Sequence, residues 1–295
     1  MKKHHKINWK KGLEITPEIF IASDNYHIAE RNLLGRFLAA QRYGIFPDSN
    51  FHIENDIENQ NIYIRNLKCN AITKDGFIVD IQQDTNFPKK IALTNSDNAE
   101  FYLILTINPF SVTLTDEKEV VYPEYNITLN RTDKPIEQGI PISKIYKNNS
   151  HWELDKNYVP PVISLNAVDT LKQKYIDIQN VISEITGKLP EEHAFYLQIM
   201  MLQIELNNYS LNETPQEFIL LLKKFCRIFQ LYIKKTKKLN EMPVVTHFME
   251  KPYNHSEIEK QLQAGFETLT AINQEIDEEP EVEEEDPIEE IEIKI

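Results

Sequence analysis

The spacing of apolar residues changes near the middle of the chain, and the change predicts a β-rich N-terminal part and a helical C-terminal part. Over residues 51–146, short segments of β-branched and aromatic residues alternate with turn residues such as Asp75-Gly76 and Asn108-Pro109. Short strands at this spacing favour an antiparallel sandwich or barrel over a parallel sheet with crossover helices. We expect strands at 61–67, 76–81, 101–107, 120–129 and 141–146.

Helical spacing appears on both sides of this region. The run from 24 to 41 predicts one helix, with Asp24 as its cap. After Pro160-Pro161, six apolar residues lie 3, 4, 3, 4 and 3 positions apart, which is typical of the seam of a coiled coil or a tight bundle. A proline at 190 and capping-box patterns at 214–217 and 256–259 predict three more helices. The seam residues are Val168, Leu171, Tyr175, Ile178, Ile182 and Ile185.

These patterns together predict an α+β protein, in which an N-terminal antiparallel β-sandwich is followed by an α-helical bundle or stalk. We divide the chain into an N-terminal arm over 1–22, the sandwich over 23–160, the bundle over 161–276 and an acidic tail over 277–295. The proline pair at the boundary fixes an extended backbone, so it suits a stiff junction between two domains.

The negative charge is concentrated at the C-terminal end. Residues 274–295 hold 12 acidic residues and one lysine, a charge of −11, which leaves −3 of the total −14 for the rest. A segment this acidic is expected to be disordered when alone. It serves either as a solubilising tail or, through its alternating end at 288–295, as a strand added to a partner's sheet.

A nearly neutral body argues against nucleic-acid binding, which needs clustered Lys and Arg. One basic cluster opens the chain, and it is read either as a solvated arm or as a nucleic-acid site, with the solvated arm favoured. Its members are Lys2, Lys3, Lys6, Lys10 and Lys11.

The search for catalytic chemistry finds no motif that a reaction would demand. The seven glycines form no phosphate-binding loop, no two histidines outside the flexible start have zinc-ligand spacing, and no serine lies in a nucleophile elbow. Cys69 and Cys226 lie in apolar segments and are expected to be buried thiols in a reducing compartment. We therefore expect no enzyme, no cofactor and no metal. Carboxylate pairs such as Asp75 and Asp80 leave a sandwich-fold carbohydrate-active enzyme as an alternative.

The sequence has no signal-peptide pattern and no apolar run long enough to span a bilayer. We expect a cytoplasmic protein without direct membrane insertion, so that any association with a membrane would come through partners.

Two tryptophan motifs resemble a known family. The segment from Trp9 to Phe20, with Gly12, Leu13, Ile15 and Pro17 at fixed offsets, resembles the opening signature of the type VI secretion baseplate subunit TssK. The segment with Trp152, Asp155, Tyr158, Pro160 and Pro161 is similar to the junction at which the β domain of that family leads into its helices.

The resemblance implies a homotrimeric structural adaptor of a contractile injection system. Its sandwich would be similar to the shell domain of phage receptor-binding proteins and would dock on the wedge proteins TssF and TssG through the arm residues Trp9, Gly12, Leu13, Ile15, Pro17 and Phe20. The seam beginning at Val168 would form the trimeric stalk. A membrane-complex protein would meet the stalk end or the acidic tail, at the inner face of the inner membrane.

The usual family member continues into a further C-terminal domain that engages the membrane complex, whereas this chain runs into the acidic tail. A phage or tailocin tail protein remains an alternative within the structural class, because it would share both the sandwich and the trimer.

Overall fold

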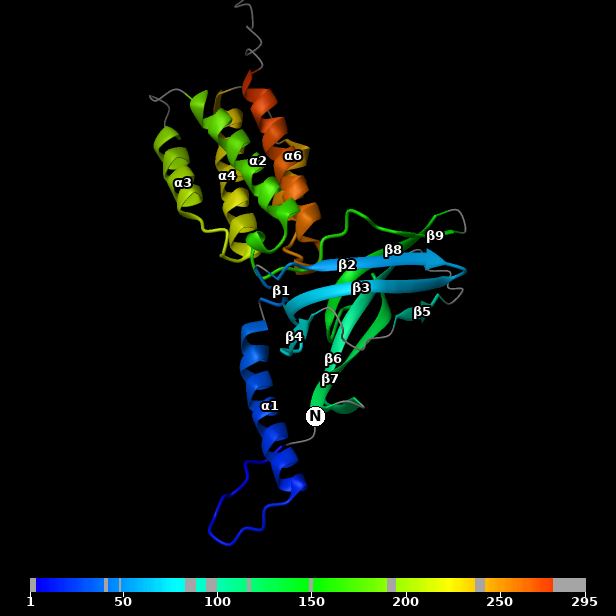
Figure 1. Ribbon diagram of the computed structural model, residues 1–295. Coiled ribbons are helices and arrows are strands. Elements are labelled where there is room, and N and C mark those ends of the chain that lie inside the picture. The colour runs from blue at the N-terminus through cyan, green and yellow to red at the C-terminus, as the bar shows by residue number, and fades with distance from the viewer. Residues whose placement is uncertain are drawn as a thin grey trace, which may run out of the picture. The chain divides into compact units, whose positions relative to one another are not determined.

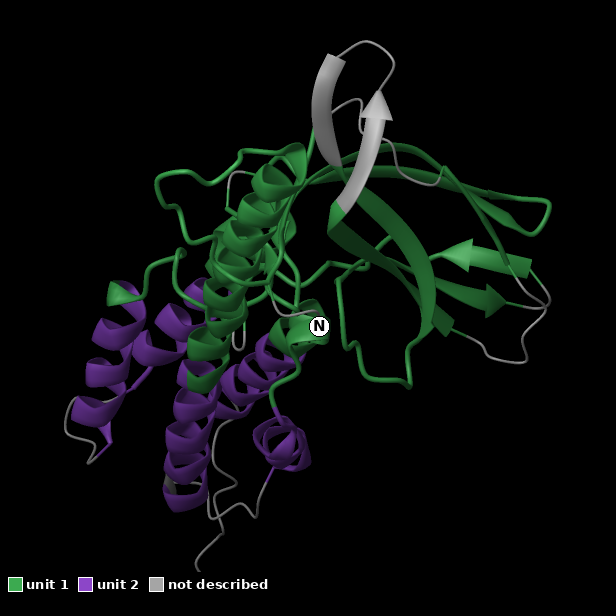
Figure 2. Cartoon of the chain, turned by 90° about the horizontal axis from the view of Figure 1, so that it is seen from below, with its two compact units in different colours: residues 1–176, 208–220, 253–263 green, residues 177–207, 221–252, 264–295 purple. Residues whose placement is uncertain are grey.

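The computed structural model describes residues 4–39, 42–47, 49–82, 89–93, 100–115, 118–148, 151–189, 195–236 and 242–277. The acidic tail beyond Asp277 and the helix start expected at Pro190 lie outside these residues. The chain divides into two compact units, of which the first holds 1–176, 208–220 and 253–263, and the second holds 177–207, 221–252 and 264–295 (Figure 2).

Among the described residues, one helix and nine strands come first along the chain (Figure 1). They are α1 (Pro17–Ala39), β1 (Gly44–Ile45), β2 (His52–Glu58), β3 (Asn61–Ile72), β4 (Ile78–Ile81), β5 (Lys90–Ala92), β6 (Glu100–Thr115), β7 (Lys118–Arg131), β8 (Ile140–Asn148) and β9 (His151–Leu154). The helical part follows as η1 (Leu165–Ala167), α2 (Asp169–Gly187), α3 (Tyr196–Asn208), α4 (Pro215–Thr236), α5 (Pro243–Glu250), η2 (His255–Glu257) and α6 (Ile258–Asp277).

The described strands form two antiparallel sheets. In the five-stranded sheet, the first part of the long strand β3 pairs with β2 and β5, and its second part pairs with β1 and β4. The other sheet has the order β7-β6-β8-β9. These sheets confirm the predicted α+β class with an N-terminal antiparallel sandwich. Its core is built from buried aliphatic residues of both sheets, including Ile62, Ile64, Leu67, Ile81, Leu103, Leu105, Ile140 and Ile142.

Side chains also join elements of the two sheets by hydrogen bonds. Asn55 on β2 donates its Nδ2 to the hydroxyl of Ser143 on β8 at 3.1 Å. The Tyr125 hydroxyl on β7 donates to the carbonyl of Asp80 on β4 at 3.1 Å. Burial raises the pKa of Tyr125, so this hydroxyl stays protonated and able to donate.

The strand boundaries differ from the predicted ones where proline or polar residues occur. The expected turn at Asn108-Pro109 lies inside β6, at a register shift between Asn108 and Thr113. Such an irregularity tolerates a proline, which has no N–H for the ladder. Strand β2 was not predicted, because its sequence is mostly polar and only alternate residues are partly buried.

The seam residues of α2 are covered within the single chain. Leu171, Tyr175, Ile178, Ile182 and Ile185 are all buried, while Val168 precedes the helix and is half-buried. The spacing is typical of a coiled coil or of a tight bundle, and helices of the same chain exclude water from five of the six residues, as in a bundle. The trimeric stalk that the resemblance implies would therefore need a surface other than these buried side chains.

Helix α4 begins with the predicted capping box. The Glu217 carboxylate accepts hydrogen bonds from the Thr214 backbone N–H at 2.9 Å and from its hydroxyl at 2.6 Å, and the Glu217 N–H donates back to Thr214 Oγ1 at 3.4 Å. These contacts lower the pKa of Glu217. Before α6, the predicted cap residue Ser256 lies inside the short helix η2, which is capped by Asn254, whose side chain accepts a hydrogen bond from the Ser256 N–H.

A candidate protein-protein interface on the first helix

Helix α1 begins seven residues earlier than the sequence pattern predicts. The carbonyl of Thr16 accepts hydrogen bonds from the N–H groups of Ile19 and Phe20, and Pro17 occupies the first helical position. Proline suits that position, because its missing N–H would have no helical partner there. Pro17 and Phe20, both assigned to the arm, therefore lie in the first turns of α1.

A close backbone contact attaches α1 to the sandwich. Asn32 and Gly35 are buried, and Asn32 Nδ2 donates to the carbonyl of Asp75 at 2.9 Å. A Cβ added at Gly35 would lie 2.0 Å from the carbonyl oxygen of Gly76, whose φ is +86°. The Asp75 carboxylate in turn accepts from the N–H of Gly139 at 3.0 Å. Helix α1 thus rests on the 73–77 turn through a contact that only glycines allow.

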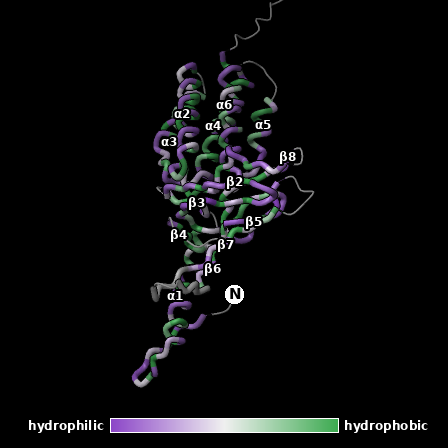
Figure 3. The backbone as a smooth tube through the Cα atoms, turned by 45° about the vertical axis from the view of Figure 1, so that its right-hand side comes forward, coloured by the Kyte–Doolittle hydropathy of each residue, from purple (hydrophilic) through white to green (hydrophobic). Residues whose placement is uncertain are grey.

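The opposite face of α1 is apolar and exposed. Leu33, Leu34, Phe37 and Leu38 have exposed fractions of 70%, 68%, 82% and 60%, and we call these four residues the α1 patch. Figure 3 shows hydrophobic positions along this helix. Soluble monomers rarely expose contiguous apolar groups of this kind, and larger patches mark interaction sites. The α1 patch is therefore a candidate surface for another protein chain.

The arm and the first turn of α1 carry a second group of exposed apolar residues. Trp9 is 50% exposed, Ile15 62% and Phe20 55%. The ring centroids of Trp9 and Phe20 are 6.3 Å apart. Gly12 makes the intervening turn with a φ of +87°, and the N–H of Leu13 donates to the carbonyl of Lys10. The structure thus brings Trp9 and Phe20 together, and Gly12 supplies the left-handed conformation that the turn requires.

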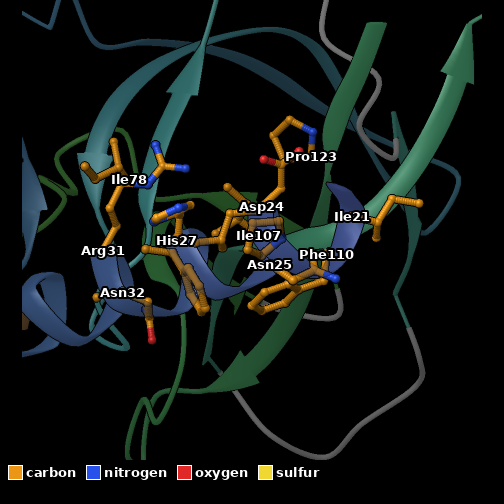
Figure 4. Close-up of a pocket in the computed structure, with 14 residues that line it drawn as sticks. Ile21, Asp24, Asn25, His27, Arg31, Asn32, Ile78, Ile107, Phe110 and Pro123 are labelled. Atoms are coloured by element: carbon orange, nitrogen blue, oxygen red, sulfur yellow. The ribbon is translucent and has the colours of Figure 1, made fainter. Parts of the chain in front are cut away.

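A pocket of about 570 Å³ lies between α1 and strands β4, β6 and β7 (Figure 4). Its α1 wall carries Asp24 and Arg31, and neither has an ion-pair partner among the residues that the structure describes. The opposite wall is apolar and includes Ile78 and Phe110. The ring of His4 stacks on Phe110 at 4.9 Å, so the start of the arm borders the pocket. The remaining lining residues are Ile21, Asn25, His27, Ile28, Asn32, Gly76, Phe77, Ile107, Pro109 and Pro123.

The predicted junction residues Pro160 and Pro161 are buried against strand β1. The carbonyl of Pro161 accepts from the N–H of Ile45 at 2.8 Å, and Ile163 donates its N–H to the carbonyl of Ile45 at 3.0 Å. A Cβ at Gly44 would lie 2.5 Å from the Pro161 oxygen. The segment from Pro161 to Ile163 therefore forms hydrogen bonds with the edge of β1 that faces away from β3.

The other three junction residues hold the last turn of the sandwich but do not form one cluster. Trp152 lies against Phe101 at 5.7 Å between ring centroids, with Lys147 Nζ 5.8 Å from its ring. The Asp155 carboxylate accepts from the N–H of Asn157 at 3.1 Å. The Tyr158 ring is 5.5 Å from that of Tyr102. Burial raises the pKa of Tyr158 well above its ordinary value.

Sequence reasoning missed a polar network next to this junction. The Tyr43 hydroxyl lies 3.0 Å from the hydroxyl of Ser256, and His255 Nε2 is within hydrogen-bond distance of the Tyr43 carbonyl. Because that nitrogen must donate, His255 Nδ1 accepts from the Tyr253 hydroxyl at 2.6 Å. Burial lowers the pKa of His255 and favours this neutral form. No motif marks these residues, since the contacts of His255 and Ser256 with Tyr43 span more than 200 positions of the sequence.

Within the described ranges, no group of three or more His, Cys, Asp and Glu side chains is placed to hold a metal ion. Burial raises the pKa of both thiols, Cys69 and Cys226, to about 12, as expected of core cysteines. None of the described helices combines the length and apolarity that crossing a membrane requires.

Comparison with known proteins finds similarity in structure only. No family model matches the sequence, and no curated protein matches it. A chain of the type VI secretion TssK-TssF-TssG baseplate subcomplex is similar with a TM-score of 0.62 and 15% identity, covering 92% of this chain and 99% of that chain. A crystal structure of TssK gives a TM-score of 0.61 and 13% identity, covering 95% and 70%. TssK from the EAEC type VI system, bound to a nanobody, gives 0.59 and 14%, covering 86% and 68%. The chain therefore has the fold of TssK.

Proposed function

We propose that this chain is a non-catalytic structural adaptor of a type VI secretion baseplate, which acts as a homotrimer and links wedge proteins to membrane-side components. One observation carries the proposal: a chain with the TssK fold exposes four large apolar residues on one face of α1. Apolar surface of this kind is stabilised when another protein covers it. The place of action would be the inner face of the inner membrane.

The arm residues are our candidates for docking on the wedge proteins TssF and TssG. Trp9 and Phe20 form an exposed aromatic pair, and aromatic anchors dominate the energetics of many interfaces. The neighbouring pocket adds an apolar wall and the charges of Asp24 and Arg31, which have no ion-pair partner among the described residues and would orient a partner segment. The similar TssK-TssF-TssG subcomplex supports this choice of partners.

The α1 patch is our candidate for contact between copies of the chain. The seam of α2 is buried inside the chain, so another surface has to mediate self-association. The α1 patch residues lie at positions i, i+1, i+4 and i+5, which form a broad stripe suited to helix packing. Each copy presents the same stripe, and closed symmetric association would bury all of them.

Two variants separate the two proposed surfaces. The Trp9→Ala, Phe20→Ala double variant should lose copurification with TssF and TssG while its mass by light scattering stays near three times 34.7 kDa. The Leu34→Glu, Phe37→Glu double variant should become monomeric with unchanged circular dichroism, because both side chains are exposed. A monomeric wild-type protein at micromolar concentration would refute the trimer, and unchanged wedge binding by the arm variant would assign Trp9 to internal packing.

A further inference from the structure

The outer surface of α3 and α4 combines apolar and basic residues. The two helices lie side by side, with Lys224 Nζ 2.8 Å from Glu205 Oε1 near one end and Lys235 Nζ 5.7 Å from the centroid of the Phe195 ring near the other. On α3, Leu197, Met201 and Ile204 have exposed fractions of 74%, 70% and 58%. Their spacing of 4 and 3 places them on one side of the helix. Together with the exposed α4 residues Arg227, Leu231, Lys234 and Lys235, they define the α3–α4 face.

Positive charge on this face has no acidic counterpart in the described part of the chain. Arg227, Lys234 and Lys235 are exposed and make no ion pair with any described carboxylate, whereas neighbouring Lys224 is paired with Glu205. The face therefore offers cations beside an apolar stripe. A segment that covers it well should carry acidic and aliphatic residues together.

The C-terminal segment 278–295 of this chain has that composition. It holds ten acidic residues and a single lysine, together with Val282 and four isoleucines at 288, 291, 293 and 295. We propose that segment 278–295 binds the α3–α4 face of its own chain, with acidic side chains on the α4 cations and isoleucines on the α3 stripe. This inference goes beyond the proposed baseplate function, because it uses neither the arm nor the α1 patch.

Segment 278–295 begins at the end of the second unit where α3 starts. Lys188, directly after α2, donates to Asp277 Oδ2 at 2.6 Å and to Asn273 Oδ1 at 2.8 Å, which fixes the last turn of α6 at the end where α2 stops. Helix α3 starts at Tyr196, eight residues after Lys188 in the sequence, and Lys235 lies over the ring of Phe195 there. The ends of α2, α4 and α6 and the start of α3 thus lie at one end of this unit (Figure 1).

Length and local concentration both permit the contact. The 18 residues after Asp277 can extend up to about 60 Å, whereas the 13 residues of α3 span about 20 Å. Each exposed ion pair stabilises by only about 0–1 kcal/mol. Covalent attachment raises the effective concentration of the segment to the millimolar range. Several weak pairs and a few apolar contacts are then enough to hold it.

Lysine acetylation followed by mass spectrometry tests the proposal on the full chain and on a chain that ends at Asp277. At low salt, Lys234 and Lys235 should react several-fold faster in the shortened chain, because the acidic segment no longer covers them. Lys134, an exposed lysine of the first unit, is the matched control and should react equally in both chains. At about 0.5 M salt, where charges are screened beyond a few ångströms, the difference should shrink.

Two further experiments test where segment 278–295 binds. Peptide 278–295 added to the shortened chain should restore protection of Lys234 and Lys235, and Met201→Asp in the full chain should reduce it. Equal reactivity of both lysines in the two chains overturns the proposal, and so does protection that Met201→Asp leaves intact, because the segment would then lie elsewhere. Light scattering of the same samples reports the trimer separately, so failure of this inference is distinguishable from failure of the proposed function.

Discussion

Gly35→Ala should detach α1 from the sandwich, although the same change in an exposed helix usually stabilises. A Cβ at this position would lie 2.0 Å from the carbonyl oxygen of Gly76 and 3.0 Å from its carbonyl carbon. Both contacts are with backbone atoms, which no rotamer change can move away. The helix or the 73–77 turn must therefore shift.

Three contributions set the magnitude. Alanine favours the helix over glycine by about 1 kcal/mol. Overpacking of a close contact costs about 1–3 kcal/mol. Displacement of α1 also breaks the hydrogen bond from Asn32 to the Asp75 carbonyl, worth about 1 kcal/mol. The net expectation is a loss of about 1–3 kcal/mol in the free energy of unfolding.

Urea denaturation and amide hydrogen exchange measure this effect. The N–H groups of Thr73 and Gly76, which are hydrogen-bonded within the turn, should exchange faster in Gly35→Ala. Gly187→Ala is the matched control, because a Cβ there meets nothing within 4 Å and should leave stability nearly unchanged. A Gly35→Ala protein as stable as wild type, with unchanged exchange in the turn, would refute the packing described for α1.

Two other changes probe the core and the junction. Ile182→Ala should lower the free energy of unfolding by about 2–5 kcal/mol, because the side chain is fully buried within one chain. The light-scattering mass should stay unchanged. Dissociation of the trimer without loss of stability would instead place the α2 seam between copies of the chain. Acid should destabilise the protein, since burial holds the pKa of His255 below the ordinary 6.5 and the unfolded chain binds a proton first. The melting temperature should fall as the pH drops through about 6.5 toward the lower pKa of His255 in the folded state. His255→Gln should weaken this dependence of the melting temperature on pH. An identical pH profile in the variant would show that His255 does not cause the acid destabilisation.

Much of the fold follows from local patterns that a sequence displays directly. Strands β3, β6, β7 and β8 follow from β-branched and aromatic runs, and the Thr214–Glu217 contact follows from a capping box whose two residues are three positions apart. The 4-3 spacing of the α2 seam correctly marks a buried stripe. Spacing cannot tell, however, whether the covering helices belong to the same chain or to another copy.

The candidate site depended on contacts that no local pattern contains. Leu33 and Phe37 look like core residues of an amphipathic helix, but the contacts of Gly35 and Asn32 with the 73–77 turn place their side of α1 outward. The His255 network joins residues more than 200 positions apart. The start of α1 was within reach of sequence reasoning, because Thr16-Pro17-Glu18 combines a cap residue, a first-turn proline and a first-turn acid.

Copurification of the intact chain from its native cell, in a strain without prophage, tests the adaptor role most directly. Our account predicts that TssF and TssG are recovered with the wild-type chain and are lost with the Trp9→Ala, Phe20→Ala variant. Recovery of the chain alone as a monomer that cleaves a carbohydrate substrate would contradict it.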